Sequence, residues 1–298
     1  MNVASPSVGA AGASTHLDGR ARLSFDRPVN STRRKLAIAT WSAPREGNIY
    51  GKLTADVSQC LRYVEHLRAT TGEKVTVGHV VGKAVALALK QAPGLNGRIV
   101  FGRFVPYKTV DVTFLVALDD GKDLAKTKIA RADEQSISAI AGAVGKGAAR
   151  LRKGEDEDFK KSQGLVRVLP SPLLRPLLWL TGFLTSALGV SALGLEAFPF
   201  GSCIITNVGA FGLDEGYAPP TPFARVPIYI LVGAVKDQPT AVDGQVVVRP
   251  TLTLTATVDH RFIDGAQLAV LARIMRQGLE APWTLDGHSE PPWAAASA

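Results

Sequence analysis

The stretch of residues 246–258, which reads VVVRPTLTLTATV, constrains the fold more than any other part of the chain. Almost every residue in it is β-branched or apolar, and this composition is typical of a long β-strand. Pro250 interrupts the stretch and has no backbone N–H to donate, so it indicates a bulge or a sheet edge at that point. The chain is therefore expected to build a β-sheet around a long strand near its C-terminus.

Shorter stretches predict the remaining elements. Residues 108–118, 202–206 and 229–235 are rich in β-branched and aromatic residues and predict three further strands. Apolar residues that recur at spacings of three and four predict helices over residues 54–72, 77–91, 130–158 and 266–278. Because helices and long strands interleave, the predicted fold class is α/β, a sandwich rather than a helical bundle.

Charge and cysteine content limit the classes of partner. A net charge of +8 and a pI near 9.6 suit an anionic membrane surface, coenzyme A or simple solubility. There is no nucleic-acid-binding motif, so we expect no nucleic-acid partner. Cys60 and Cys203 are the only cysteines, and they lie far apart without metal-ligand spacing. We therefore expect no disulfide, no metal and a reducing, cytoplasmic location.

The two ends differ in composition from the middle. Residues 1–27 are rich in Ala, Gly and Ser, lack the apolar run of a signal peptide and predict a flexible tail. Residues 286–298 are rich in Pro and Ala and predict a loose C-terminal tail. One domain is expected between them, over residues 28–285.

The strongest chemical signal, DHRFIDG at residues 259–265, lies between the long strand and the last helix. The histidine, His260, follows a strand, so a ligand can reach it while the sheet holds its backbone, and its near-neutral pKa suits proton transfer. Asp264 lies near it if the chain turns into a helix there, and Gly265 permits a tight turn. From the residues alone, a structural histidine beside a helix-capping aspartate is an equally good interpretation.

A second histidine, His79, lies in the first turn of the predicted helix 77–91, for which Thr76 is the expected N-cap. A single histidine in that position favours a local polar contact over a catalytic role.

Taken together, the motifs resemble the catalytic core of the dihydrolipoamide acyltransferases, the second components of 2-oxoacid dehydrogenase complexes, which share the chloramphenicol acetyltransferase fold. The DHRFIDG motif is similar to the family's catalytic signature. Four other segments resemble segments of the family and occur in the same order along the chain. They are RRKLA at 33–37, the helix around KAVALAL at 83–89, ITNVG at 205–209, and the hairpin from Asp243 to Pro250. The resemblance covers residues 28–164 and 201–285.

The resemblance implies a role for each matching residue. His260 would be the general base that takes the proton from the thiol of coenzyme A or dihydrolipoamide. The Thr206 hydroxyl would donate a hydrogen bond to the oxyanion of the tetrahedral intermediate. Asp264 would hold the catalytic loop, with Arg33 as its ion-pair partner. The family's fold is a two-layer sandwich with a mixed sheet and flanking helices, and its active site lies between the subunits of a trimer. His260 and Thr206 would then come from different chains.

Three departures from the family bear on substrates and partners. Residues 121–127 and 222–227 replace the family's usual residues at those places. Only about 30 residues precede the first matching segment, so we expect no covalent lipoyl group on this chain and a separate lipoyl-bearing protein if lipoamide is the acceptor. Residues 165–200 form an apolar insertion, which predicts a helical hairpin that turns near Gly189. It would pack on the core or contact a membrane surface or partner, because a single membrane span would cut the domain in two.

Two other functions compete with transfer between thiols. The same base would also activate a small hydroxyl or amine acceptor, as in the chloramphenicol acetyltransferases. The chain could instead be a non-catalytic trimeric assembly module that docks to a membrane or partner. A trimer is favoured over a larger cage, because the C-terminus ends in small residues after Trp293 rather than in an apolar segment.

Overall fold

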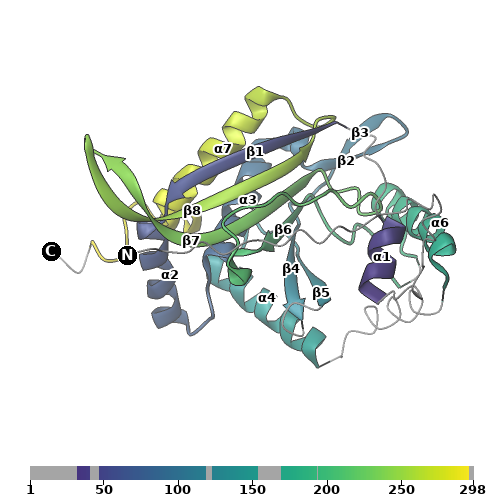
Figure 1. The fold of residues 1–298 in the computed structure, drawn as a ribbon, viewed down its shortest axis with the longest axis horizontal. Coiled ribbons are helices and arrows are strands. Elements are labelled where there is room, and N and C mark those ends of the chain that lie inside the picture. The colour runs from purple at the N-terminus through teal and green to yellow at the C-terminus, as the bar shows by residue number, and fades with distance from the viewer. Residues whose placement is uncertain (1–31, 41–46, 119–122, 154–168, 193, 295–298) are drawn as a thin grey trace, which may run out of the picture.

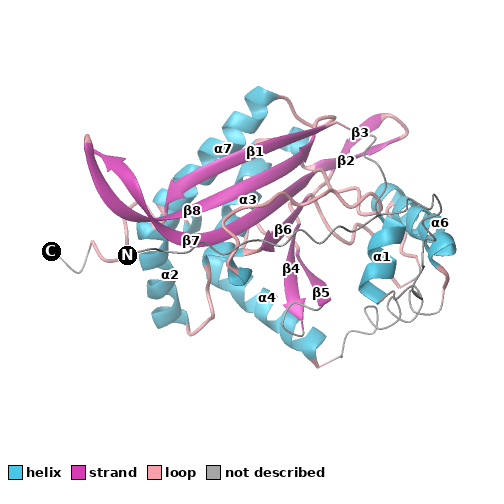
Figure 2. Ribbon diagram, in the orientation of Figure 1, coloured by secondary structure: helices cyan, strands magenta, loops and turns pink. Residues whose placement is uncertain are grey.

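The computed structural model describes residues 32–40, 47–118, 123–153, 169–192 and 194–294 (Figure 1). Within them, six strands form one mixed sheet in the order β1-β8-β7-β6-β4-β5. The strands are β1 (Asn48–Asp56), β4 (Val112–Leu118), β5 (Asp123–Ile129), β6 (Cys203–Asn207), β7 (Ile228–Val242) and β8 (Gln245–Asp259). A separate hairpin pairs β2 (Gly97–Val100) with β3 (Arg103–Pro106) (Figure 2).

Four helices cover one face of the large sheet and share its main core: α2 (Ser58–Thr71), α3 (Val77–Gln91), α4 (Ile137–Arg152) and α7 (Gly265–Glu280). Away from this layer, α1 (Thr32–Thr40) packs against α6 (Ser171–Gly182) at one end of the molecule (Figure 1). The opposite face of the sheet is covered by the chain near Ala224 and Val226, which packs on Ile204 and Tyr229. The molecule is thus the expected α/β sandwich with a mixed sheet.

Alternation along β8 separates these two faces. Leu252, Leu254 and Val258 point into the core under the helices, whereas the threonines between them face the other side. Strand β1 pairs with β8 only from Thr251 onward, so Pro250 has a strand on one side only. The prediction of an edge at Pro250 is confirmed. The irregularity in pairing lies instead on β7, between Val232 and Val235.

Two strands of the large sheet, and the separate β2–β3 hairpin, were missed in the sequence. Residues 48–56 form edge strand β1, so the helix expected from residue 54 begins only at Ser58. Residues 123–129 form the other edge strand, β5, whose lysines alternate with apolar residues. Both strands bear polar residues because an edge strand is only half covered, and this weakens the signal that identifies a strand. The helix expected over 130–158 spans Ile137–Arg152 in the described residues.

The predicted helical hairpin within 165–200 is wrong. Helix α6 continues as a π-helical turn, η3 (Phe183–Leu188), which ends at Gly189 with a φ of 72°. The described residues of 190–200 contain no second helix. Lysines of β5 hold this part of the chain instead, because Lys128 pairs with Glu196 at 3.0 Å and also donates to the carbonyl oxygen of Phe198. No helix in the described ranges has the length and apolarity to cross a membrane.

The boundaries 28 and 285 stay predictions, and residues 1–27 lie outside the described part of the chain. The predicted C-terminal tail, however, is packed as far as it is described. The ring of Trp293 lies 5.6 Å from that of Trp283, and the Arg62 guanidinium stacks over it at 4.3 Å. A large aromatic side chain gains free energy by leaving water, which accounts for this docking.

His79 makes the predicted local contact. The backbone N–H of Thr76 donates to its Nδ1 at 3.1 Å, the ring is 9% exposed, and it meets the ring of Phe114 edge-on. Burial, and secondarily the charge of Arg68, lowers the pKa of His79 from 6.5 to about 4.

Protonation of His79 is expected to destabilise the fold. Because the folded-state pKa is lower than the unfolded one, the unfolded chain binds the proton more readily between pH 6.5 and 4. The contribution of neutral His79 to the free energy of unfolding is complete above pH 6.5. It decreases as the pH falls to 4, by about 3 kcal/mol in total. Urea unfolding at several pH values should show that the free energy of unfolding depends less on pH in His79→Gln than in the unmodified protein. The glutamine side chain can still accept a hydrogen bond from the backbone N–H of Thr76. Identical pH profiles for the two proteins would contradict this assignment.

Candidate functional site

His260 is held at the end of the sheet. The backbone N–H of His260 donates to the carbonyl oxygen of Gly47 at 3.0 Å, directly beyond the pairing of Asn48 with Asp259. The residue is exposed, and none of the described residues hydrogen-bonds its ring. The backbone is thus fixed while the imidazole is free to meet a ligand, which is the arrangement that a general base needs.

The turn after His260 is fixed by an ion pair that the sequence analysis did not identify. The Arg261 guanidinium donates to both carboxylate oxygens of Asp259, at 3.0 and 2.6 Å. Phe262 then packs edge-on against Phe104, and Ile263 is 3% exposed. Opposite charges two residues apart at a strand end were the available signal, and the structure gives them the role of bracing the loop.

Asp264 is the N-cap of α7. Its carboxylate accepts from the backbone N–H of Gln267 at 3.0 Å, and the side chain of Gln267 in turn accepts from the backbone N–H of Asp264. The helix-capping interpretation is therefore confirmed for Asp264, and the cap anchors the loop that bears His260 to α7. The side chain of Arg33 lies outside the described part of the chain, so the ion pair with Asp264 stays a prediction.

Gly265 does not occupy the tight turn expected of it. It is the first residue of α7, is absent from the glycines with positive φ, and a Cβ atom there would meet nothing within 4 Å. The turn itself therefore does not require glycine at this position. What distinguishes the position is the open space beside it.

Thr206 lies near the end of β6. Cys203 and Ile205 point into the helix-covered core, so alternation places Thr206 on the opposite face, where it is partly exposed. The turn that follows rests on β7, because the N–H of Val208 donates to the carbonyl oxygen of Val232 at 2.9 Å.

Gly233 explains the irregularity in β7. A Cβ atom at Gly233 would collide with the carbonyl oxygen of Asp214, and one at Gly209 would collide with the carbonyl oxygen of Gly233. Both glycines are thus needed for the turn after Thr206 to lie against β7. Gly209 belongs to the ITNVG segment, whereas the role of Gly233 is visible only in this tertiary contact.

A single chain does not bring His260 and Thr206 together. Thr206 pairs with Leu231, and Leu231 pairs with Thr255, which lies five residues before His260. At the rise of an extended strand, the two residues are separated by ~17 Å along the sheet alone.

Two charged pairs lie on this side of the sheet among the described residues. Asp259 pairs with Arg261, and the Lys52 ammonium pairs with Glu215, whose hydrogen bond raises the pKa of Lys52. The described residues contain no group of three or more His, Cys, Asp or Glu side chains that could hold a metal ion. What the site offers chemically is therefore an unpaired imidazole and a hydroxyl.

Asp264→Ala is expected to lower the free energy of unfolding by about 1 kcal/mol, because it removes the cap of α7. Asp264→Asn and Asp264→Ser keep an oxygen that can accept from Gln267, and they should stay within a few tenths of a kcal/mol of the unmodified protein. Chemical unfolding measures all three. Equal losses for Ala and Asn would show that the charge, and not the cap, matters.

Comparison with known proteins places the chain among acyltransferases. The sequence model described as "2-oxoacid dehydrogenases acyltransferase (catalytic domain)" matches residues 25–164 and 188–286. A Schizosaccharomyces pombe protein named probable dihydrolipoyllysine-residue succinyltransferase component of the 2-oxoglutarate dehydrogenase complex is 26% identical over 236 residues, covering 77% of this chain and 43% of the relative. The chain spans about half the length of the curated relatives it matches, 39–56% for three of them.

Solved structures agree on the fold. A probable dihydrolipoamide acetyltransferase from Listeria monocytogenes superposes with a TM-score of 0.63 at 19% identity, covering 86% of this chain and 94% of that one. The cubic core of a pyruvate dehydrogenase multienzyme complex superposes with a TM-score of 0.64 at 20% identity, covering 89% and 96%.

The two matched stretches include the sheet, the Thr206 turn and the complete His260 loop, and they omit residues 165–187. The chain therefore belongs to the family of 2-oxoacid dehydrogenase acyltransferase catalytic domains.

Proposed function

We propose that this chain transfers an acyl group between coenzyme A and a second thiol, with His260 as the general base. The observation that carries the proposal is the exposed imidazole at the end of β8, whose backbone is tied to Gly47 while its ring has no partner among the described residues. The relatives are named dihydrolipoyllysine-residue succinyltransferases and acetyltransferases, and these names support the same reaction class.

Each step of the reaction has a group to perform it. A free thiol has a pKa near 8.5, so little of it is thiolate at neutral pH, and a positioned base contributes about 10²–10⁴ in rate. His260 takes the thiol proton, and the thiolate adds to the carbonyl carbon of the acyl thioester. The Thr206 hydroxyl donates to the resulting oxyanion. The intermediate then expels the other thiolate, which takes the proton back from the imidazolium.

The separation of His260 from Thr206 favours an active site shared between two chains of a homotrimer. The sheet face that bears Thr206 also carries large exposed side chains, among them Tyr50, Phe211 and Leu213. A neighbouring protomer would cover them and bring its own His260 to Thr206. The likeness to a cubic core supports trimers as the unit of any larger assembly.

The acceptor that fits these relatives is a dihydrolipoyl group, carried by a separate domain or protein. A small hydroxyl or amine acceptor would use the same base, and a screen of dihydrolipoamide against alcohols and amines with one acyl-CoA separates them. A pure assembly module would need neither the free imidazole of His260 nor the Thr206 hydroxyl.

His260→Ala is expected to lower kcat for acyl transfer from acetyl-CoA to dihydrolipoamide by about 10²–10⁴ while the oligomer stays intact. Thr206→Ala should lower kcat by about 10²–10³, and Thr206→Ser should keep most of the activity. Co-expression of His260→Ala and Thr206→Ala chains should restore activity, because some interfaces then combine an intact His260 with an intact Thr206. Full activity of the His260→Ala homotrimer would end the proposal, and no gain in the mixed trimers would place both residues in one chain's site.

For the segment 165–200 we infer contact with an anionic membrane surface. Exposed apolar side chains gather around α6, and we call them the α6 patch: Ile38, Phe101, Leu173, Trp179 and Leu180. Trp179 is 60% exposed and stacks on Phe183, which also meets Phe101. Residues 165–195 contain Arg167 and Arg175 but no acidic residue. Aromatic and leucine side chains on the same helix as Arg175, in a stretch without acidic residues, suit the headgroup boundary of an anionic bilayer.

The α6 patch predicts co-sedimentation with vesicles that contain phosphatidylglycerol and weaker binding to neutral phosphatidylcholine vesicles. Trp179→Ser with Leu180→Ser should abolish binding, whereas Val246→Ser with Val248→Ser, at two exposed apolar positions of β8, should leave it unchanged. Equal vesicle binding by both double variants would contradict the inference. Loss of the trimer in the first variant would identify the patch as an interface between copies.

A further inference from the structure

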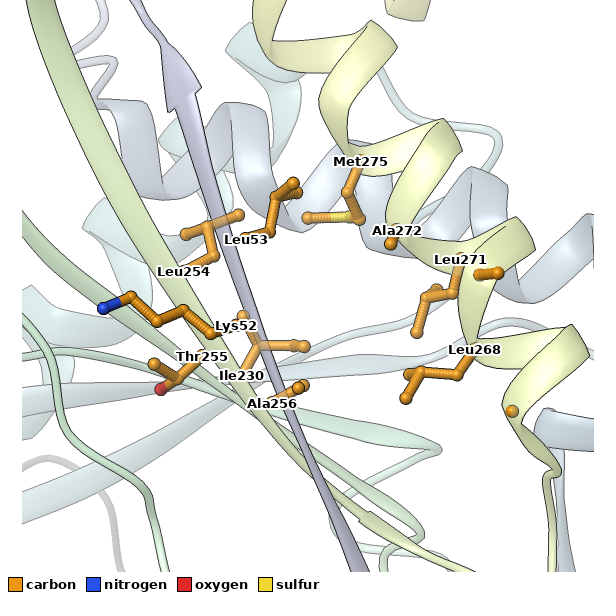
Figure 3. A pocket seen from close by; sticks show the side chains of 13 residues that line it. Lys52, Leu53, Ile230, Leu254, Thr255, Ala256, Leu268, Leu271, Ala272 and Met275 are labelled. Atoms are coloured by element: carbon orange, nitrogen blue, oxygen red, sulfur yellow. The ribbon is translucent and has the colours of Figure 1, made fainter.

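A groove of about 300 Å³ lies between α7 and the sheet strands β1 and β8 (Figure 3). Most of its wall is aliphatic or thioether, from Leu53, Ile230, Leu254, Leu268, Leu271 and Met275. Protein interiors contain few voids larger than a water molecule, so a space of this size is one that a ligand can fill.

Small residues keep the groove open on both sides. Gly51 and Ala256 line it from the sheet, and Ala269 and Ala272 line it from α7. A Cβ atom at Gly51 would already lie 3.7 Å from the Leu268 side chain, so any larger side chain there would narrow the space.

The polar side chains at the groove point elsewhere. Figure 3 shows Lys52 and Thr255 extending away from α7. The Lys52 ammonium pairs with Glu215, and the Thr255 hydroxyl donates to the carbonyl oxygen of Gly216. A polar occupant would therefore lose its hydrogen bonds to water without replacement, whereas an aliphatic chain would lose none. The chemistry of the walls selects an aliphatic occupant.

The groove is continuous with the catalytic loop. Gly265, the last residue of the DHRFIDG motif, lines it, and nothing lies within 4 Å of the place where a Cβ atom would stand. Ala256 precedes His260 by four residues on the same strand, which corresponds to ~13 Å. An acyl chain whose thioester lies at His260 can thus reach the groove past the N-terminus of α7.

We propose that this groove holds the aliphatic chain of the acyl thioester, so that the enzyme selects linear acyl groups on the order of eight to ten carbons, the length that spans the ~13 Å. The proposal rests on the proposed acyl transfer and adds the class of acyl group. Each methylene that leaves water for the groove should raise kcat/KM about fourfold.

The test compares acyl-CoA substrates from acetyl to dodecanoyl with dihydrolipoamide as acceptor. For the unmodified trimer, kcat/KM should rise with chain length and then level off. Ala272→Phe places a ring in the groove and should lower kcat/KM for decanoyl-CoA by about 10–100-fold, while acetyl-CoA is used as before. Arg273→Phe carries the same ring at the adjacent exposed position and should leave the profile unchanged. If Ala272→Phe does not fold, Ala269→Phe, at an exposed position of the groove wall, serves instead.

A second readout separates this proposal from acyl transfer itself. Calorimetry should show decanoyl-CoA binding at least tenfold more tightly than coenzyme A, with the difference abolished in Ala272→Phe. A flat chain-length profile, equal losses for acetyl and decanoyl substrates, or equal binding of coenzyme A and decanoyl-CoA would overturn the groove proposal. Failure of every acyl-CoA to react would instead overturn the proposed function and leave the calorimetric result to decide the groove.

Discussion

Strand β8 is paired on both sides between Thr251 and Val258, by β1 and by β7, and the rest of the molecule is arranged around this double pairing. One of its faces buries Leu252, Leu254 and Val258 under the helices, and the other is lined with threonines. A one-residue slip would exchange these faces, so the register is strongly specified. Because the register is fixed, the residue that follows the strand, His260, also has a fixed backbone position.

The loop after β8 is held in place by contacts of its own, so the site it forms is also rigid. The pairing of Asp259 with Arg261, the packing of Phe262 on Phe104 and the Asp264 cap brace the turn, and His260 lies exposed on it. A general base contributes most when its position is held without help from the substrate. The second functional residue, Thr206, depends in the same way on a tertiary contact, because the glycines at 209 and 233 let its turn lie against β7.

The loop that bears His260 and the groove share α7, and this connects the acyl selectivity that we propose to the proposed catalysis. The Asp264 cap sets where α7 begins, and the first turn of that helix borders the groove at Gly265. A change in the angle or start of α7 would therefore alter both the base and the space proposed for the acyl chain. Three members of the α6 patch, Leu173, Trp179 and Leu180, lie outside the stretches that the family model matches, so the proposed partner of the patch is independent of the chemistry proposed at His260.

The sequence by itself determined which segments alternate, where α3 begins and ends, and which motif follows the long strand. These properties depend on neighbours one to four residues apart, and they were enough to predict β8, α3, the local contact of His79 and the helix after DHRFIDG. The tertiary structure decided the rest. Edge strands β1 and β5 exist because of their pairing with distant segments, and their own residues are too polar to signal it. The separation of His260 from Thr206 and the groove between Gly51 and Ala272 depend on strand order and on how closely α7 approaches the sheet. Contacts between residues far apart in the chain leave no periodic trace in it, and for that physical reason only the folded molecule could reveal them.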